Sequence, residues 1–155
     1  LATKIIDSSM LSPHQLRAQV IQLVHGKESG IPLVVQIQSF GFRWGIPPDS
    51  DLVMDVRFLP NPHFVPELQP MSGLDKSVRE FVLSRGPCRE FLDYSRNMLK
   101  FLLPHYQKEG KSYLTISIGC TGGRHRSVAI VEELSQFLGG EKVPLRVVHR
   151  DIHKE

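Results

Sequence analysis

Apolar residues recur along this chain at two spacings, one typical of strands and one typical of helices. Short runs of branched apolar residues, continuous or alternating with polar ones, indicate strands, whereas apolar residues three or four positions apart indicate helices. The pattern predicts strands at residues 33–39, 51–57, 112–118 and 145–149. It predicts helices at residues 13–25, 75–84, 88–108 and 126–138.

Local signals set the expected ends of these helices. Ser12 followed by Pro13 is typical of a helix start, and Gly26 and Gly30 are expected to end that helix. Asp75 is expected to cap the second helix. Pro104 lies within the third helical segment and is expected to kink it or to end its regular part.

Strands that alternate with helices predict a single α/β domain, with a mostly parallel central sheet of about four strands flanked by helices. Ligands of such sheets bind at the carboxyl ends of the strands. The loops that follow the first three strands, at residues 40–48, 58–73 and 119–127, are therefore expected to meet at one edge of the sheet.

Composition narrows the class of protein. The chain has 155 residues, 41% of them hydrophobic and 23% charged, which is typical of one globular domain. It contains no apolar run of the roughly 20 residues that a membrane span needs. Cys88 and Cys120 do not form a Cys-x-x-Cys pair, so a reducing cytoplasm is the simpler interpretation. A net charge of +3 permits contact with nucleic acid but does not indicate it.

Residues 119–127, with the sequence GCTGGRHRS, combine a strand end, a glycine-rich turn and a helix start. Backbone N–H groups converge on an anion in this geometry, because the first N–H groups of a helix lack partners. Thr121 and Ser127 can donate from their hydroxyl groups, and Arg126 can contact two oxygens of a phosphate. A phosphate-bearing ligand is the first hypothesis, and a tight turn with basic surface residues is the alternative.

The same residues also match the spacing of cysteine-dependent phosphatases. In those enzymes a thiolate at the position of Cys120 attacks phosphorus, and an arginine at the position of Arg126 stabilises the transition state. Asp55 could then be the general acid. Gly119 argues against this alternative, because phosphatases usually place a histidine before the cysteine.

A second cluster of polar residues follows the second predicted strand. Asp55, Arg57, Asn61 and His63 could bind a polyhydroxy ligand and its phosphate, or Asp55 and Arg57 could pair to brace a proline-rich loop. Two further groups carry less information. Arg43 lies among aromatic residues whose main expected role is packing, and His149 and His153 have no neighbouring ligands to complete a metal site. We therefore expect no metal.

Four segments together resemble the C-terminal domain of the bacterial RapZ/YvcJ family: FGFRWG at residues 40–45, DVRFLPNPH at 55–63, PMSGLD at 70–75 and GCTGGRHRS at 119–127. Family members carry an N-terminal P-loop domain that binds ATP or GTP. The resemblance therefore implies that residues 1–11 are a linker from a nucleotide-binding domain absent here. It implies that residues 12–155 are a metabolite- and RNA-binding domain with no cofactor or catalytic residue of its own.

The resemblance also implies a function. Enterobacterial members bind glucosamine-6-phosphate and small regulatory RNAs, present the RNA to RNase E, and assemble as homo-oligomers. A phosphorylated amino sugar or a related nucleotide sugar is thus the expected ligand. Its expected contacts are Asp55, Arg57, His63, Thr121, Gly122, Gly123, His125 and Arg126.

RNA binding is expected, less firmly, at four arginines: Arg43, Arg124, Arg146 and Arg150. Enterobacterial members end in a Lys/Arg-rich tail, whereas residues 151–155 are nearly balanced in charge. Because affinity for nucleic acid grows with the number of cations engaged, the sequence favours the metabolite pocket over the RNA site.

Overall fold

The central sheet of the computed structural model has four parallel strands in the order β2-β3-β1-β4. The structure describes residues 5–25 and 32–154. Val35 of β1 pairs with Leu114 of β3 on one side and with Leu145 of β4 on the other. The prediction of one α/β domain with a parallel sheet of about four strands is confirmed. In chain order the elements are α1 (Pro13–His25), β1 (Val34–Gly41), η1 (Phe42–Trp44), β2 (Leu52–Asp55), η2 (Pro62–Phe64), α2 (Lys76–Leu83), α3 (Gly86–Glu109), β3 (Tyr113–Cys120), α4 (Arg126–Gly140) and β4 (Leu145–His149).

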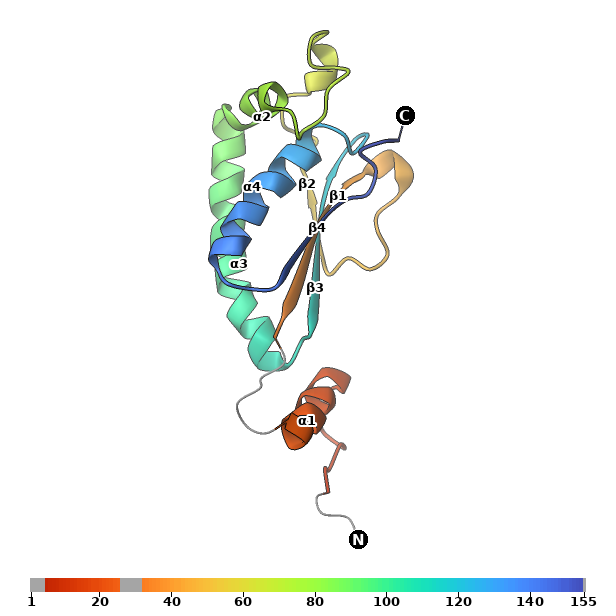
Figure 1. Cartoon of the computed structure of the whole chain (residues 1–155), viewed down its shortest axis with the longest axis vertical. Coiled ribbons are helices and arrows are strands. Elements are labelled where there is room, and N and C mark those ends of the chain that lie inside the picture. Colours follow the sequence, from red (N-terminus) through yellow and green to blue (C-terminus); the bar gives the residue numbers. More distant parts are fainter. Residues whose placement is uncertain (1–4, 26–31, 155) are drawn as a thin grey trace.

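The hydrophobic core lies between the sheet and three helices. Helices α2, α3 and α4 cover one side of the sheet, and the loop at residues 42–51 lies on the other side (Figure 1). Ile37 and Ile116 face α4, whose Ile130 and Leu134 are completely buried. Burying a side chain of this size stabilises the fold by roughly 1.5–3 kcal/mol, so α4 is a principal anchor of the domain.

The side of the sheet under the loop is polar. Gln38 of β1 donates from Nε2 to the hydroxyl of Ser117 on β3 (2.9 Å), and this hydroxyl also lies 2.6 Å from the hydroxyl of Ser50. Ser117 is completely buried, so these bonds satisfy groups that would otherwise be costly to bury. They hold the loop after β1 against the sheet and so position the residues at its beginning.

Most of the expected helix ends are confirmed, and the expected cap at Asp75 is wrong. Ser12 caps α1, because its hydroxyl accepts the N–H of Gln15 (3.2 Å). Asp75 precedes α2 but does not cap it, because its carboxylate accepts instead from the N–H of Ser72 (2.7 Å). Pro104 does not end α3, which continues to Glu109. The proline is exposed, so water can satisfy the carbonyl that it leaves unbonded. Gly26 and Gly30 lie outside the described residues.

The described residues contain neither a membrane-spanning helix nor a group suited to hold a metal ion. None of the helices there is long and apolar enough to cross a membrane. No three His, Cys, Asp or Glu residues in this part of the chain are placed to hold a metal ion.

Candidate ligand-binding site

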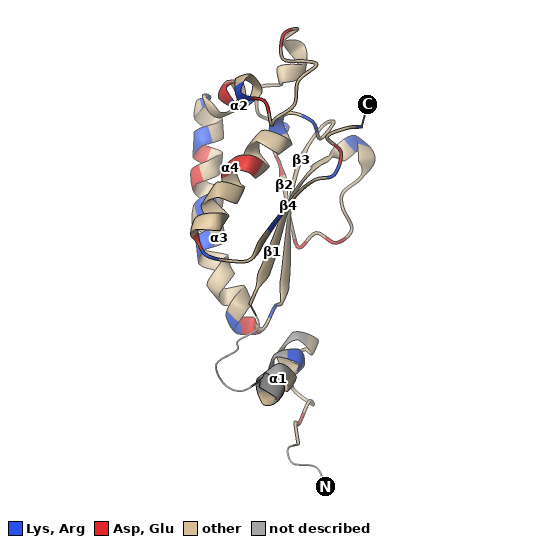
Figure 2. Ribbon diagram, in the orientation of Figure 1, with Lys and Arg blue, Asp and Glu red and all other residues tan. Residues whose placement is uncertain are grey.

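A cavity of about 1250 Å³ opens at the carboxyl ends of the strands. It receives residues from the loops after β1, β2 and β3, so the expectation that these loops meet at one edge is confirmed. Figure 2 shows basic residues in the loops at this end of the sheet. The lining residues are Arg43, Arg57, Leu59, Asn61, His63, Phe64, Pro66, Gln69, Pro70, Cys120, Thr121, Gly122, Arg124, His125, Arg126 and Lys154.

The glycine-rich turn lies directly on the end of β1. Gly123 has a φ of +80°, and a Cβ there would lie 2.6 Å from the backbone nitrogen of Gly41. A Cβ on Gly41 would in turn lie 2.5 Å from the carbonyl carbon of Gly122. Both glycines are therefore needed for the close approach of the two backbones. Gly122 differs, because a Cβ there would point into open space beside the cavity.

Several backbone donors of this turn are free. The N–H of Gly123 donates to Cys120 Sγ (3.3 Å), whereas the N–H groups of Thr121, Gly122 and Arg124 donate to no acceptor in the described part of the chain. The turn leads into the N-terminus of α4, where the helix dipole favours negative charge. Free N–H groups at a helix start are the arrangement that binds phosphate oxygens.

Arg126 ties the two loops together rather than simply extending into the cavity. It is 4% exposed, and its Nη1 donates to the backbone carbonyls of Arg57 (2.7 Å) and Leu59 (3.0 Å). Nη2 donates to the hydroxyl of Thr121 (3.1 Å). Nε is the one buried side-chain nitrogen or oxygen of the described residues that lacks a hydrogen-bond partner. A buried donor without an acceptor costs about 1–3 kcal/mol, so an acceptor placed at this atom would stabilise the cavity wall.

Asp55 and Arg57 form a two-bonded ion pair. Arg57 Nε and Nη2 lie 2.9 and 2.7 Å from Asp55 Oδ2, and this hydrogen bonding lowers the pKa of the Asp55 carboxyl. Arg57 also lies over the ring of Phe42, 4.1 Å from its centroid. Arg57 lines the cavity and Asp55 does not. Asp55 therefore orients Arg57 in this structure.

Two histidines face one another across the cavity. The rings of His63 and His125 are 6.4 Å apart, and His125 Nε2 donates to the carbonyl of Gln69 (3.1 Å). Burial lowers the pKa of His125 and outweighs the hydrogen bond to Gln69, which acts to raise it; the positive charge of Arg124 lowers it further. A phosphate between the two loops would have the opposite effect, because a nearby negative charge favours imidazolium.

Arg124 holds the loop at residues 58–73 against the turn. Its Nη2 donates to the carbonyl of Pro70 (2.6 Å), and its own carbonyl accepts the N–H of Gly73 (2.9 Å). A Cβ on Gly73 would lie 2.3 Å from the carbonyl oxygen of His125, so only glycine permits this contact. The result is a cavity whose walls are fixed to one another.

The predicted residues thus divide into two groups. Six of the eight expected ligand contacts line the cavity, and Asp55 and Gly123 do not. The four arginines expected for RNA do not form one patch: Arg43 and Arg124 line the cavity, Arg150 is paired with Asp151, and Arg146 lies exposed on β4. Sequence reasoning missed Lys154 and Gln69. Only the return of the chain's end over the turn brings Lys154 to the cavity.

Cys120 occupies a sheltered position in the turn. Its Sγ lies 3.1 Å from the hydroxyl of Ser127, and the residue is 3% exposed. A side chain at Gly119 would collide with the rings of Phe40 and Phe42, both 2.5 Å from a Cβ there. The Arg126 guanidinium is turned toward backbone carbonyls. The phosphatase hypothesis would need Arg126 to leave these acceptors for a phosphoryl group held over Cys120.

Together the fold and the cavity define an α/β domain with a glycine-rich turn and a cavity at the carboxyl edge of a parallel sheet. The RapZ C-terminal domain model matches residues 33–153, and the chain belongs to this family. It is 63% identical over its full length to a "nucleotide-binding protein" of Syntrophotalea carbinolica. It is 56% identical over 99% of its length to one of Geobacter sulfurreducens. The chain spans about half the length, 54%, of each of these relatives.

Proposed function

We propose that this domain is a non-enzymatic sensor that binds a phosphorylated amino sugar, glucosamine-6-phosphate or a related nucleotide sugar. The observation that carries the proposal is the buried, unpartnered Nε of Arg126 beside the free N–H groups of the glycine turn. Five basic residues line the cavity, and none of its described lining residues carries a carboxylate. A ligand with a concentrated negative charge is the natural complement of such a lining.

In this proposal each part of the ligand has its own partners. The phosphate takes hydrogen bonds from the turn amides, from Thr121 and from Arg126. Arg57, which Asp55 orients, contacts the ligand where the phosphate joins the sugar. The two histidines contact the same part of the ligand. Asn61 and Gln69 line the cavity and can accept from hydroxyl or amino groups of the sugar.

The wider role of the protein is part of the same proposal and rests on the family. The family resemblance supports a cytoplasmic homo-oligomer that presents small regulatory RNA to RNase E and releases or retains it according to the sugar phosphate. It also supports binding of ATP or GTP by the N-terminal domain of family members that carry one. The relatives' name, "nucleotide-binding protein", agrees with that division of functions.

Gly122→Leu tests the pocket. A side chain at Gly122 meets no described atom within 4 Å and would fill the space beside the turn, so we expect a folded protein with at least about tenfold weaker binding of glucosamine-6-phosphate. Gly139→Leu is the matched control, because Gly139 is equally open and lies at the far end of α4. Calorimetry on the three proteins measures the effect. Equal affinity in all three, or no binding by the unaltered chain, would contradict the proposal.

A further inference from the structure

We infer that the cavity has a second anion subsite, formed by Arg43 and Lys154 beside Trp44, and that a ligand with a second phosphate group therefore binds more tightly than a sugar monophosphate. This inference rests on the proposed function for the first phosphate, at the turn and Arg126. It adds that the second phosphate lies on the other side of the turn.

The size of the cavity supports a ligand longer than a sugar monophosphate. At about 1250 Å³ it exceeds the roughly 300–1,000 Å³ typical of small-molecule sites. The residues proposed for the first phosphate and its sugar, among them Arg57, His63 and Arg126, come from only two of the loops. The cavity continues past these residues to Arg43 and Lys154.

The order of the strands separates two groups of cations. Arg57 follows β2, whereas Arg43 follows β1 and Lys154 follows β4; in the order β2-β3-β1-β4 the turn after β3 lies between them. Neighbouring strands are about 4.8 Å apart, so the strand ends that carry the two groups are separated by roughly 10–14 Å. The two groups of cations therefore lie on opposite sides of the turn. This arrangement suits two phosphates that a sugar holds apart.

Arg43 is held in place by its backbone while its charge stays free. Its N–H donates to the carbonyl of Thr121 (3.2 Å), which fixes it beside the turn. Arg150 donates to the carbonyl of Gly45 (2.7 Å) and anchors the other end of this short segment. The Arg43 guanidinium lies 4.8 Å from the centroid of the Trp44 ring and makes no hydrogen bond or ion pair with any residue that the structure describes.

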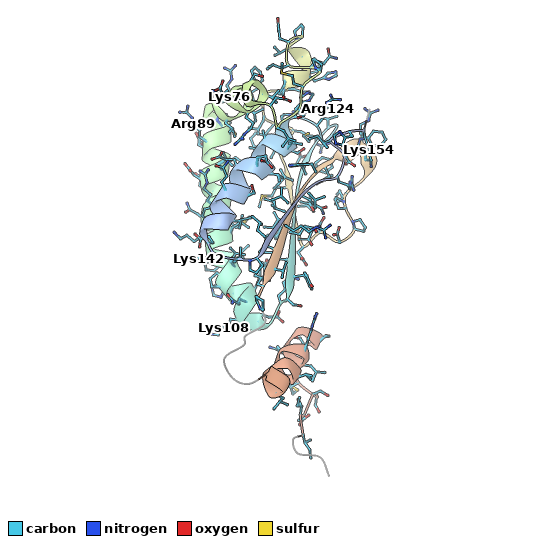
Figure 3. All side chains as sticks on the ribbon, in the orientation of Figure 1. Lys76, Arg89, Lys108, Arg124, Lys142 and Lys154 are labelled. Carbon is cyan, nitrogen blue, oxygen red and sulfur yellow. The ribbon has the colours of Figure 1, made fainter. Side chains whose placement is uncertain are left out.

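Lys154 approaches the same ring from the end of the chain. Its Nζ lies 5.3 Å from the Trp44 centroid and 2.8 Å from Asp151 Oδ1. Asp151 is also paired with Arg150, so two cations share this one carboxylate. The group keeps an excess of positive charge at the mouth of the cavity. Figure 3 shows Lys154 at the same end of the molecule as Arg124, which lines the cavity near the first group.

Arg43→Gln separates this subsite from the first. The probes are glucosamine-6-phosphate, with one phosphate, and two ligands with two: glucose-1,6-bisphosphate and UDP-N-acetylglucosamine. We expect the unaltered chain to bind at least one of the latter about tenfold more tightly than the monophosphate, and Arg43→Gln to remove that advantage. Affinity for the monophosphate should change less than about twofold, because Arg43 lies beyond its contacts. The ligand that shows the advantage tells a sugar bisphosphate from a nucleotide sugar.

Arg89→Gln is the charge-matched control, because Arg89 is exposed on α3 away from Lys154 (Figure 3). It should leave all three affinities unchanged. Equal affinity for the ligands with one and two phosphates would overturn the second subsite while leaving the proposed function intact. Failure of every probe to bind would overturn both. An Arg43→Gln effect confined to a short oligoribonucleotide, with none on the ligands with two phosphates, would also overturn the inference and assign Arg43 to RNA.

Discussion

Individual side chains at the cavity have positions that their chemistry explains. Arg126 is the example: three of its five N–H groups donate to the protein, and its buried Nε–H has no partner. It therefore joins the loop after β2 to the turn after β3 and still has an N–H to offer. Removing this side chain would disturb the cavity wall as well as ligand contact, which is why Gly122 is the cleaner site for a test.

His125 should make the domain less stable at acid pH. Burial lowers the pKa of its imidazole below the ordinary 6.5, so the unfolded chain takes up a proton more readily than the folded one. The contribution of His125 to the free energy of unfolding is fully present above about pH 6.5. It decreases as the pH falls through this value toward the pKa of His125 in the folded state. Urea unfolding of wild type and His125→Gln between about pH 7.5 and 5.5 measures this, and the variant should show the flatter profile.

His105→Gln is the control for this titration. His105 is exposed on α3, against Phe101, and its replacement should preserve the wild-type slope. Parallel profiles for wild type and His125→Gln would show that His125 titrates alike in both states.

Cys120 is expected to be a packing residue of the turn. A serine hydroxyl can make both contacts that the Cys120 sulfur makes, with the N–H of Gly123 and the hydroxyl of Ser127. The affinity of Cys120→Ser for glucosamine-6-phosphate should therefore lie within about threefold of the wild-type affinity. Neither protein should hydrolyse p-nitrophenyl phosphate. Cys88→Ser is the control, because burial raises the pKa of the Cys88 thiol to about 11 and keeps it protonated. Turnover that is lost only in Cys120→Ser would instead support the phosphatase.

At the scale of elements, the end of β1 is the point where three segments meet. The glycine turn packs on Gly41, and the segment after β4 reaches over both. Asp151, completely buried, accepts the N–H of Gly41 (2.8 Å) and pairs with Arg150 and Lys154. The hydrogen bonds of these partners lower the pKa of Asp151 and outweigh the effect of its burial, which acts to raise it. This carboxylate joins the C-terminal segment to the cavity.

Asp151→Ala should destabilise the domain by about 3 kcal/mol, because it leaves a buried N–H and two cations without their acceptor. Asp93→Ala is the matched control. Asp93 is exposed and pairs only with Arg96, so its loss should cost less than about 0.5 kcal/mol. Urea unfolding of both variants provides the comparison, and equal losses would show that Asp151 has no special structural role.

At the scale of the whole molecule, the described core is formed without α1. Its buried residues run from Leu33 onward, and Figure 1 shows α1 beyond the lower end of the sheet, opposite the cavity. Among the described side chains, two hydrogen bonds join this helix and its cap to the rest: Ser12 Oγ to Glu109 (3.2 Å) and Arg17 Nη1 to Ser112 (3.1 Å). The cavity therefore belongs to the part of the chain that the family model also matches.

A chain that begins at residue 32 should fold and bind ligand like the longer one. Loss of two side-chain hydrogen bonds of this kind corresponds to roughly 1–2 kcal/mol, or a fall in melting temperature of about 3–8 °C. Thermal unfolding and calorimetry of the shortened chain check this. Loss of cooperative unfolding would show that α1 completes the domain.

Local signals were sufficient where the physics is local. The capping of α1 by Ser12 and the strand-turn-helix at residues 113–126 follow from residues close in sequence, so they could be predicted. The prediction that Asp75 caps α2 was wrong, because the backbone N–H of Ser72 competes for the Asp75 carboxylate. Lys154 and Asp151 could not be placed, because their roles depend on where the end of the chain returns.

The sequence by itself determined the α/β class, the order of helices and strands, and the turn in which N–H groups, hydroxyls and cations gather. Periodicity and turn chemistry encode these features over short stretches of chain. Only the tertiary structure decided which groups remain free. It engages Arg126 with two backbone carbonyls, withdraws Asp55 into its pair with Arg57, and brings Arg43 and Lys154 to one ring. These outcomes depend on the order of the strands and on competition among residues far apart in the sequence. The local sequence pattern determines neither.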